Sequence, residues 1–327
     1  MKLLKKILKW TLITLITLLT LFLFIFVRFD IPLEDLENTY FTEYSHYIDV
    51  TVNTLEGNPL TITMHYQDLG DIADPVVVLV HGAFSSSHTF LPWAESLVAE
   101  GYRVIMPDLP YFGLSGGFID QITSFRRSAE AIKGILDSLS ITEIDIAGNS
   151  LGGAASWFLA SEYPEMVRHL VLIDALFPYQ EQGSRSQLSA FTNYDIVSNF
   201  LSKLSPKFLV KALLKTAYGD ASLLTDEVLT RYYELLLKEG TRKSILTVIQ
   251  EDEPEFSYQD RLESITTPTY VIWGSLDTWI DPSTIDLFQD TIGFPNDHIF
   301  IFDGLGHVPM EEDPDTTVST LISILID

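Results

Sequence analysis

The sequence predicts an α/β fold: a mostly parallel sheet of eight strands with helices on both faces, one transmembrane helix before it, and a helical insertion after the sixth strand. Three observations lead to this prediction. Short apolar runs alternate with amphipathic stretches, which is typical of a parallel sheet covered on both faces. The chain has 327 residues, 46% of them hydrophobic, so it can bury a large core. An uncharged apolar stretch lies near its N-terminus.

That N-terminal stretch is long enough to cross a membrane. Residues 10–27 carry no charge, and a helix over them spans roughly 27 Å, close to the thickness of the hydrocarbon core. Four lysines precede it, and no small-residue cleavage site follows it. We therefore expect an uncleaved anchor rather than a cleaved secretory signal. By the positive-inside rule, the N-terminus is cytoplasmic and the rest of the chain lies on the extracytoplasmic side of the membrane.

Eight apolar runs predict the strands, after a polar linker at about residues 29–45. The first two runs alternate apolar and polar residues, as an antiparallel edge does, and the other six are continuously apolar, as strands buried on both faces are. The runs cover residues 47–54, 61–66, 76–80, 102–107, 143–148, 169–175, 269–274 and 298–304.

Helical patterns lie between these runs, at residues 88–101, 124–139, 150–164 and at the C-terminus. Between the sixth and seventh runs a long insertion contains no convincing strand and two amphipathic helices. Because it follows the carboxyl end of a parallel strand, it should cover any site at that edge as a lid. The predicted organisation is an anchor (1–30), the first part of the core (31–176), a helical cap (177–262) and the second part of the core (263–327).

Composition excludes several classes of function. The net charge of −25 would repel nucleic acid. The chain has no cysteine, which excludes disulfides, thiolate metal sites and a cysteine nucleophile. Its seven histidines show no metal-binding spacing. We therefore expect a protein without metal or organic cofactor.

One serine stands at a tight corner. The sequence Gly148-Asn149-Ser150-Leu151-Gly152 directly follows a predicted strand and opens a predicted helix. A serine there takes a strained backbone conformation that lifts its oxygen clear of the sheet, and the glycines on either side avoid a collision across the turn. This is the context of the G-x-S-x-G nucleophile elbow, so we predict that Ser150 is a nucleophile.

A serine nucleophile needs a base and a group that orients the base. Asp277 follows the seventh apolar run and His307 follows the eighth, so both should lie on the same edge of the sheet as Ser150. The order serine, acid, histidine is the order expected for such an elbow. Asp174, at the end of the sixth run, is the rival candidate for the acid.

Backbone amides are the expected oxyanion donors. The turn at His81 and Gly82 follows the third run and should face the serine, so we assign the donors to the amides of Ala83 and Leu151. His81 is expected to brace this turn. Other acidic residues are interpreted as structural: Asp108 as a turn residue, Asp281 as a helix cap, and Asp303, Glu311 and Glu312 as solvated or local caps.

At this point the chain from about residue 47 to 327 resembles an α/β-hydrolase-fold protein with a helical cap. The motifs that carry the resemblance are HGAF, DLPYFGLS, GNSLGG, WGSLD and GHVPMEEDP, which occur in this order. The resemblance implies a serine hydrolase in which Ser150, Asp277 and His307 are nucleophile, acid and base. In one departure from the family pattern, Tyr111 replaces a glycine, which should change the loop before Gly113.

The anchor and the apolar lid favour a carboxylic ester with a hydrophobic acyl chain, a small molecule or a lipid, as the substrate. Asn149 also resembles the corresponding residue of carbon–carbon bond hydrolases of ring-cleavage products, which are the second candidate. Amide hydrolysis and a non-catalytic binding module are further alternatives, and the oligomeric state is open. The residues that could line an apolar substrate pocket are Phe84, Phe112, Phe177, Tyr179, Trp279 and Val308.

Overall fold

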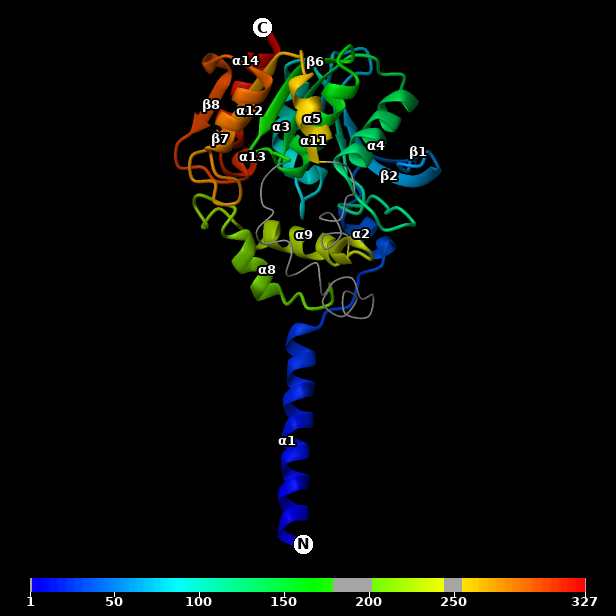
Figure 1. The fold of residues 1–327 in the computed structure, drawn as a ribbon, viewed down its shortest axis with the longest axis vertical. Helices are drawn as coiled ribbons and strands as arrows, with labels where there is room; N and C mark the ends of the chain where they lie inside the picture. Colours follow the sequence, from blue (N-terminus) through cyan, green and yellow to red (C-terminus); the bar gives the residue numbers. More distant parts are fainter. Residues whose placement is uncertain (1, 179–201, 244–254, 327) are drawn as a thin grey trace.

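A computed structural model describes residues 2–178, 202–243 and 255–326, and it confirms the predicted fold class (Figure 1). Its eight-stranded sheet has the order β1-β2-β4-β3-β5-β6-β7-β8. The strands are β1 (Ser45–Asn53), β2 (Pro59–Leu69), β3 (Val76–Val80), β4 (Arg103–Pro107), β5 (Ile144–Asn149), β6 (Val167–Ile173), β7 (Thr269–Gly274) and β8 (Ile299–Phe302).

The two kinds of apolar pattern correspond to two kinds of strand pairing. β1 pairs with β2 and β2 with β4 in antiparallel register, whereas all pairs from β4 to β8 are parallel. The alternating runs therefore form the antiparallel edge, and the continuously apolar runs form the parallel part. Because the parallel strands share a direction, the chain segments that follow β3, β5, β6, β7 and β8 leave the sheet at one edge.

Helices cover both faces of the sheet (Figure 1). Those packed around the core are α3 (Leu91–Ala99), α4 (Phe125–Ser138), α5 (Leu151–Glu162), α11 (Glu255–Glu263), α12 (Thr284–Ile292), α13 (Pro309–Glu312) and α14 (Pro314–Ile326). Residues 87–90, the start of the helix expected over 88–101, form a turn of 3₁₀-helix before α3. This four-residue 3₁₀ turn ends directly before α3, which has Pro92 in its first turn.

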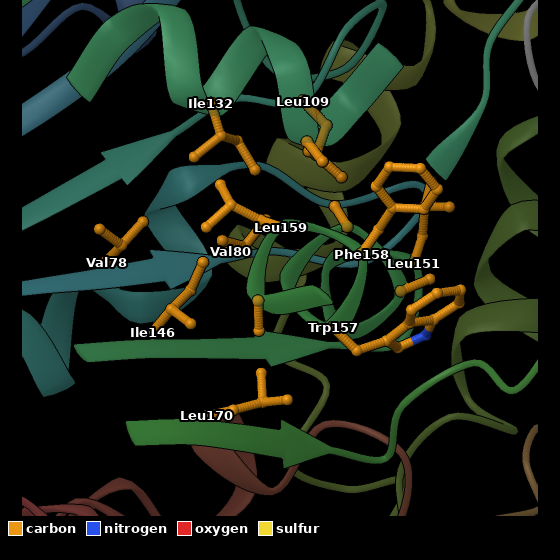
Figure 2. Close-up of a cluster of buried hydrophobic side chains, with 14 of the residues drawn as sticks. Val78, Val80, Leu109, Ile132, Ile146, Leu151, Trp157, Phe158, Leu159 and Leu170 are labelled. Atoms are coloured by element: carbon orange, nitrogen blue, oxygen red, sulfur yellow. The ribbon is translucent and has the colours of Figure 1, made fainter. Parts of the chain in front are cut away.

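Large side chains of α5 occupy the middle of one core layer. Trp157, Phe158 and Leu159 are almost completely buried and pack over Ile146 of β5 and Leu170 of β6 (Figure 2). Burying one such side chain stabilises the fold by about 1.5–3 kcal/mol. Burial of this helix therefore holds the start of α5, which follows the predicted nucleophile, against the sheet.

The N-terminal helix α1 (Lys2–Phe26) projects away from the body of the protein, and none of its residues is buried (Figure 1). It is long and apolar enough to cross a membrane. The segment after it is less irregular than expected: residues within the predicted linker form α2 (Leu33–Tyr40). Leu36 is 2% exposed and packs with Leu114 and Leu235, and this single buried side chain is too weak a pattern to predict a helix.

The insertion after β6 contains the expected amphipathic helices, α8 (Lys207–Leu214) and α9 (Asp226–Leu236). Both lie on the side of the molecule from which α1 emerges (Figure 1). The last part of the insertion behaves differently, because Tyr258 and Leu262 of α11 pack with Trp157 and Phe158 in the core. The described part of the insertion thus has one portion over the edge of the sheet and one on its face.

Candidate active site

Ser150 occupies the corner between β5 and α5. Its φ of 54° and ψ of −117° lie in a sparsely populated region for a residue with a side chain. Hydrogen bonds fix the corner, because the Ser150 amide donates to the Ile173 carbonyl (3.0 Å) and the Ser150 carbonyl accepts from Leu176 (3.0 Å) and Ala154 (3.1 Å). The strain is thus held by the parallel pairing of β5 with β6.

The glycines around Ser150 are required by close approaches of the backbone. A Cβ atom on Gly148 would lie 2.4 Å from the Gly152 carbonyl oxygen, and one on Gly152 would lie 2.2 Å from the Val80 carbonyl oxygen. Real Cβ atoms do not approach so closely, so any other residue would push α5 away from the sheet. The spacing that predicts the elbow has a steric cause here.

The turn after β3 lies directly against the serine. A Cβ atom on Gly82 would lie 2.9 Å from the Cβ of Ser150, so Ala83 follows at the position expected of an oxyanion donor. His81 is buried and braces this turn: its Nδ1 lies 2.7 Å from the Gly82 oxygen, and its Nε2 accepts from the Leu109 amide at 2.9 Å. Burial lowers the pKa of His81, so the ring is neutral in this role.

Asp277 and His307 come together beyond the ends of β7 and β8. The Asp277 Oδ2 lies 2.8 Å from the His307 Nδ1, and both side chains are buried. The other carboxylate oxygen accepts from the amides of Trp279 (2.7 Å) and Ile280 (3.1 Å). This arrangement holds the carboxylate and leaves the far nitrogen of the imidazole for a second partner, as a general base requires.

Asp174, the rival acid, has a different environment. Its Oδ1 accepts from the Gly274 amide at 3.0 Å, while its buried Oδ2 has no donor to accept from. Burial, with the nearby charge of Asp277, raises its pKa well above the ordinary value. A protonated Asp174 can donate to Asp277 instead of orienting the histidine. Ligand atoms of Asp174, Asp277 and His307 lie within 4.8 Å of one another, and within this group the His307 Nδ1 is bonded to Asp277.

Asn149 and Glu312 hold the loop that carries His307. The side-chain amide of Asn149 donates to the carbonyls of Ile173 (3.2 Å) and His307 (3.0 Å). Glu312 accepts from three amides, those of Gly306 (2.7 Å), Gly219 (2.8 Å) and Asp220 (3.2 Å), which joins the loop to the cap. Burial nevertheless raises the pKa of Glu312. Sequence reasoning missed both roles.

Two interpretations of acidic residues as solvated or turn residues are wrong. Glu311 is not solvated: it accepts from Thr89 (2.6 Å) and Arg231 (2.6 Å), and it also bonds Tyr218 and Tyr232, which ties α9 to the core. Asp108 is more than a turn residue. It is fully buried and accepts from Ser87 (2.6 Å) and Leu114 (2.7 Å) and contacts His65.

These bonds outweigh the cost of burying the Asp108 charge. Burial alone would raise its pKa, but the direct contact with His65 holds the pKa below its ordinary value. Nothing in the local sequence distinguishes such an aspartate from a solvated one, because its partners come from β2 and from the 3₁₀ turn before α3.

A narrow pocket opens beside His307. Trp279 and Val308 line it together with Ala83, and the Trp279 ring lies 5.0 Å from the imidazole. Cap residues close its other side, namely Leu214, Ala217, Tyr218 and Tyr232. An adjoining apolar pocket is lined by Phe84, Val210, Leu213, Leu214, Tyr232 and Leu236.

The other pocket candidates lie elsewhere. Phe112 and Phe177 are buried in the core cluster and are not among the residues that line these two pockets. Tyr179 lies outside the described residues. Of the six aromatic and aliphatic candidates, Trp279 and Val308 thus line the pocket beside His307, and Phe84 lines the adjoining one.

Tyr111 adopts the left-handed conformation that a glycine would take, with φ of 72°. Its ring packs against Gly117, and its hydroxyl donates to the Phe118 carbonyl at 2.8 Å. The ring therefore points away from the pocket beside His307. It lines a separate cavity of about 650 Å³, together with Lys203 and Arg242, and no candidate catalytic residue lines that cavity.

Comparisons with known proteins agree with this architecture. A family model described as alpha/beta hydrolase fold matches residues 75–314. A 2-hydroxy-6-oxononadienedioate/2-hydroxy-6-oxononatrienedioate hydrolase of Paraburkholderia phymatum is 30% identical over 262 residues, which cover 78% of this chain and 88% of that protein. Lipase 1 of Psychrobacter immobilis is 26% identical and covers 78% of each chain. The crystal structure of a bacterial membrane phospholipase A, 21% identical, superposes with a TM-score of 0.65 over 99% of this chain and 98% of that one.

Proposed function

The chain belongs to the alpha/beta hydrolase fold family, and on this premise we propose that it is a serine hydrolase that cleaves carboxylic esters with hydrophobic acyl groups. The observation that carries the proposal is the buried Asp277–His307 pair at the sheet edge where Ser150 stands on a strained corner. A neutral imidazole oriented by a carboxylate is what a serine hydroxyl needs to become nucleophilic.

In the proposed mechanism, Ser150 attacks the acyl carbonyl while His307 takes its proton. Asp277 stabilises the imidazolium that forms. The amides of Ala83 and Leu151 bind the oxyanion, at about 2.7–4 kcal/mol of transition-state stabilisation for each donor. His307 then gives the proton to the leaving alcohol, and water attacks the acyl-enzyme by the same steps in reverse. The residues that this mechanism uses are all supplied by the chain.

The pocket beside His307 favours an uncharged ester over the substrate class of the Paraburkholderia relative. A dioate carries two carboxylates, which need cationic partners when they are bound. In the described part of the chain, no lysine or arginine lines this pocket, and Arg231 nearby is already paired with Glu311. The net charge of −25 also disfavours the approach of a dianion.

Asn149 does not alter this preference. Both hydrogens of its side-chain amide are used within the protein, on the carbonyls of Ile173 and His307. Its presence before the serine therefore has a structural reason that ester and carbon–carbon hydrolases can share. Carbon–carbon cleavage remains the second candidate, because relatives with that name cover most of the chain.

We also propose that α1 anchors the enzyme in a membrane, with the catalytic domain on the extracytoplasmic side. The support is the length and apolarity of α1, the absence of buried residues in it, and the lysines at its N-terminal end. The solved structure that superposes over nearly the whole chain is described as that of a membrane phospholipase A, which is compatible with a membrane location.

The test of the proposed activity is hydrolysis of a p-nitrophenyl ester series from acetate to palmitate by the full-length protein in detergent. We expect turnover that is abolished in Ser150→Ala. The acyl chain length that is cleaved fastest should indicate the size of the acyl pocket. A vinylogous diketo acid tests the second candidate in parallel. Folded protein that cleaves the diketo acid and no ester would replace the ester assignment, and inactivity on both would favour a binding role.

A further inference from the structure

The segment that follows α1 is fastened to the cap. The Arg28 amide donates to the Lys203 carbonyl (2.8 Å), and the Ile31 amide donates to the Leu237 carbonyl (2.8 Å). Asp30 forms ion pairs with Lys203 and Arg242. The helix that would leave the membrane is therefore held against the cap, and the cap is the part of the protein nearest the membrane surface (Figure 1).

The helix α8 stands at this junction with an apolar face exposed. Phe208, Leu209 and Leu213 are 55%, 48% and 44% exposed. The Phe208 ring lies 6.0 Å from that of Phe26, the last residue of α1, so the exposed face of α8 continues the apolar surface of the anchor. Exposed apolar side chains that gather on one face in this way are typical of an interaction surface.

The charge of the same segment is opposite to that of the whole protein. Residues 202–216 contain four lysines and no acidic residue, in a chain with a net charge of −25. Two of these lysines contact α9: Lys207 donates to Thr230 (2.9 Å), and Lys211 pairs with Asp226 (3.1 Å). Lys215, directly after α8, is exposed. An apolar face bordered by lysines is the composition of helices that lie in the interface of a membrane containing anionic lipids.

The opposite face of α8 forms a wall of the candidate active site. Leu214 is 4% exposed and lines the pocket beside His307, while Val210 lines the adjoining apolar pocket. A single helix thus separates the exposed apolar face from the pocket. We propose that the outer face of α8 docks on the anionic membrane surface from which α1 emerges, so that an ester substrate reaches Ser150 directly from the bilayer.

Docking can be tested without reference to activity. Because the chain has no cysteine, Leu209→Cys introduces a single thiol for an environment-sensitive fluorophore. Ile301→Cys is the matched control, since it is a similarly exposed apolar residue (54%) on β8, an edge strand of the core that lies apart from α1 and α8 (Figure 1). Both are measured in the full-length protein, reconstituted in phosphatidylcholine vesicles with or without phosphatidylglycerol.

We expect blue-shifted emission and severalfold protection from iodide quenching at position 209 and not at 301, with greater protection when phosphatidylglycerol is present. Equal iodide quenching at positions 209 and 301 would overturn the proposed docking surface. Protection at 209 that does not depend on phosphatidylglycerol would overturn the role of the lysines.

The substrate route rests on the proposed ester hydrolysis and needs a second measurement. Leu209→Gln should lower the rate of hydrolysis of an ester embedded in the vesicles by roughly threefold or more, because the cap loses apolar contact with the bilayer. It should leave the rate on soluble p-nitrophenyl butyrate unchanged, since Leu209 lines neither pocket. An equal loss on both substrates would overturn the route. Wild-type inactivity on both would instead refute the proposed function and leave the fluorescence result standing.

Discussion

Glu312 should control both the stability of the protein and the position of His307. Its carboxylate accepts from the amides of Gly306, Gly219 and Asp220 at 2.7–3.2 Å. Glu312→Ala leaves three donors without their acceptor, which costs about 4 kcal/mol if each loses slightly more than 1 kcal/mol. Glu312→Gln keeps one acceptor and removes a buried charge whose pKa burial has raised, so we expect a smaller cost of about 2 kcal/mol.

For a chain of this size these costs lower the Tm by about 8 °C and 4 °C. The assay is thermal unfolding of full-length protein in detergent, followed by circular dichroism, together with kcat/KM on a p-nitrophenyl ester. Activity should fall at least about tenfold in the alanine variant, because a displaced base loses its alignment with the serine. Glu165→Gln, at an exposed loop position, controls for the change of charge. An alanine variant that melts within about 2 °C of wild type, with full activity, would refute this reasoning.

Substitution of the two aspartates near His307 should affect kcat to very different extents. Asp277→Asn should lower kcat by about 10⁴-fold, whereas Asp174→Asn should cost less than about tenfold; the reverse order would make Asp174 the acid. Because the pKa of Asp174 is raised in the folded state, its contribution to stability is present below the unfolded pKa and is lost as pH rises through the folded pKa. Asp174→Asn should therefore gain stability relative to wild type as pH rises from acid to neutral, measured by chemical denaturation, and a difference independent of pH would contradict this. Ser150→Gly should be inactive yet more stable than Ser150→Ala by about 1 kcal/mol, since glycine relieves the strain at φ 54°, and equal stabilities in thermal unfolding would show that the corner is unstrained.

The strands could be predicted because burial on both faces leaves a simple signature. Val76–Val80 and Thr269–Gly274 are continuously apolar, and the structure forms β3 and β7 over those residues. The elbow could be predicted for a related reason, since Gly148 and Gly152 are demanded by backbone contacts only a few residues away or in the adjacent strand. Helix α2 has no such signature, because it buries little besides Leu36.

The buried acidic residues could not be predicted, because their partners lie far away in the sequence. Asp108 is stabilised by His65 and Ser87, and Glu311 by Thr89 and Arg231. The choice between Asp174 and Asp277 was open for a similar reason. Both follow neighbouring strands, β6 and β7, and the hydrogen bonds that distinguish them, above all that from Asp277 to His307, join residues far apart in the sequence.

The central claim is that Ser150 is a nucleophile activated by His307. The most direct measurement is reaction of the full-length protein with a fluorophosphonate, followed by mass spectrometry of its peptides. We predict a single adduct on the peptide that contains Ser150, lost in Ser150→Ala and slowed severely in His307→Ala. A folded protein that does not react, or that reacts at another serine, would contradict the claim.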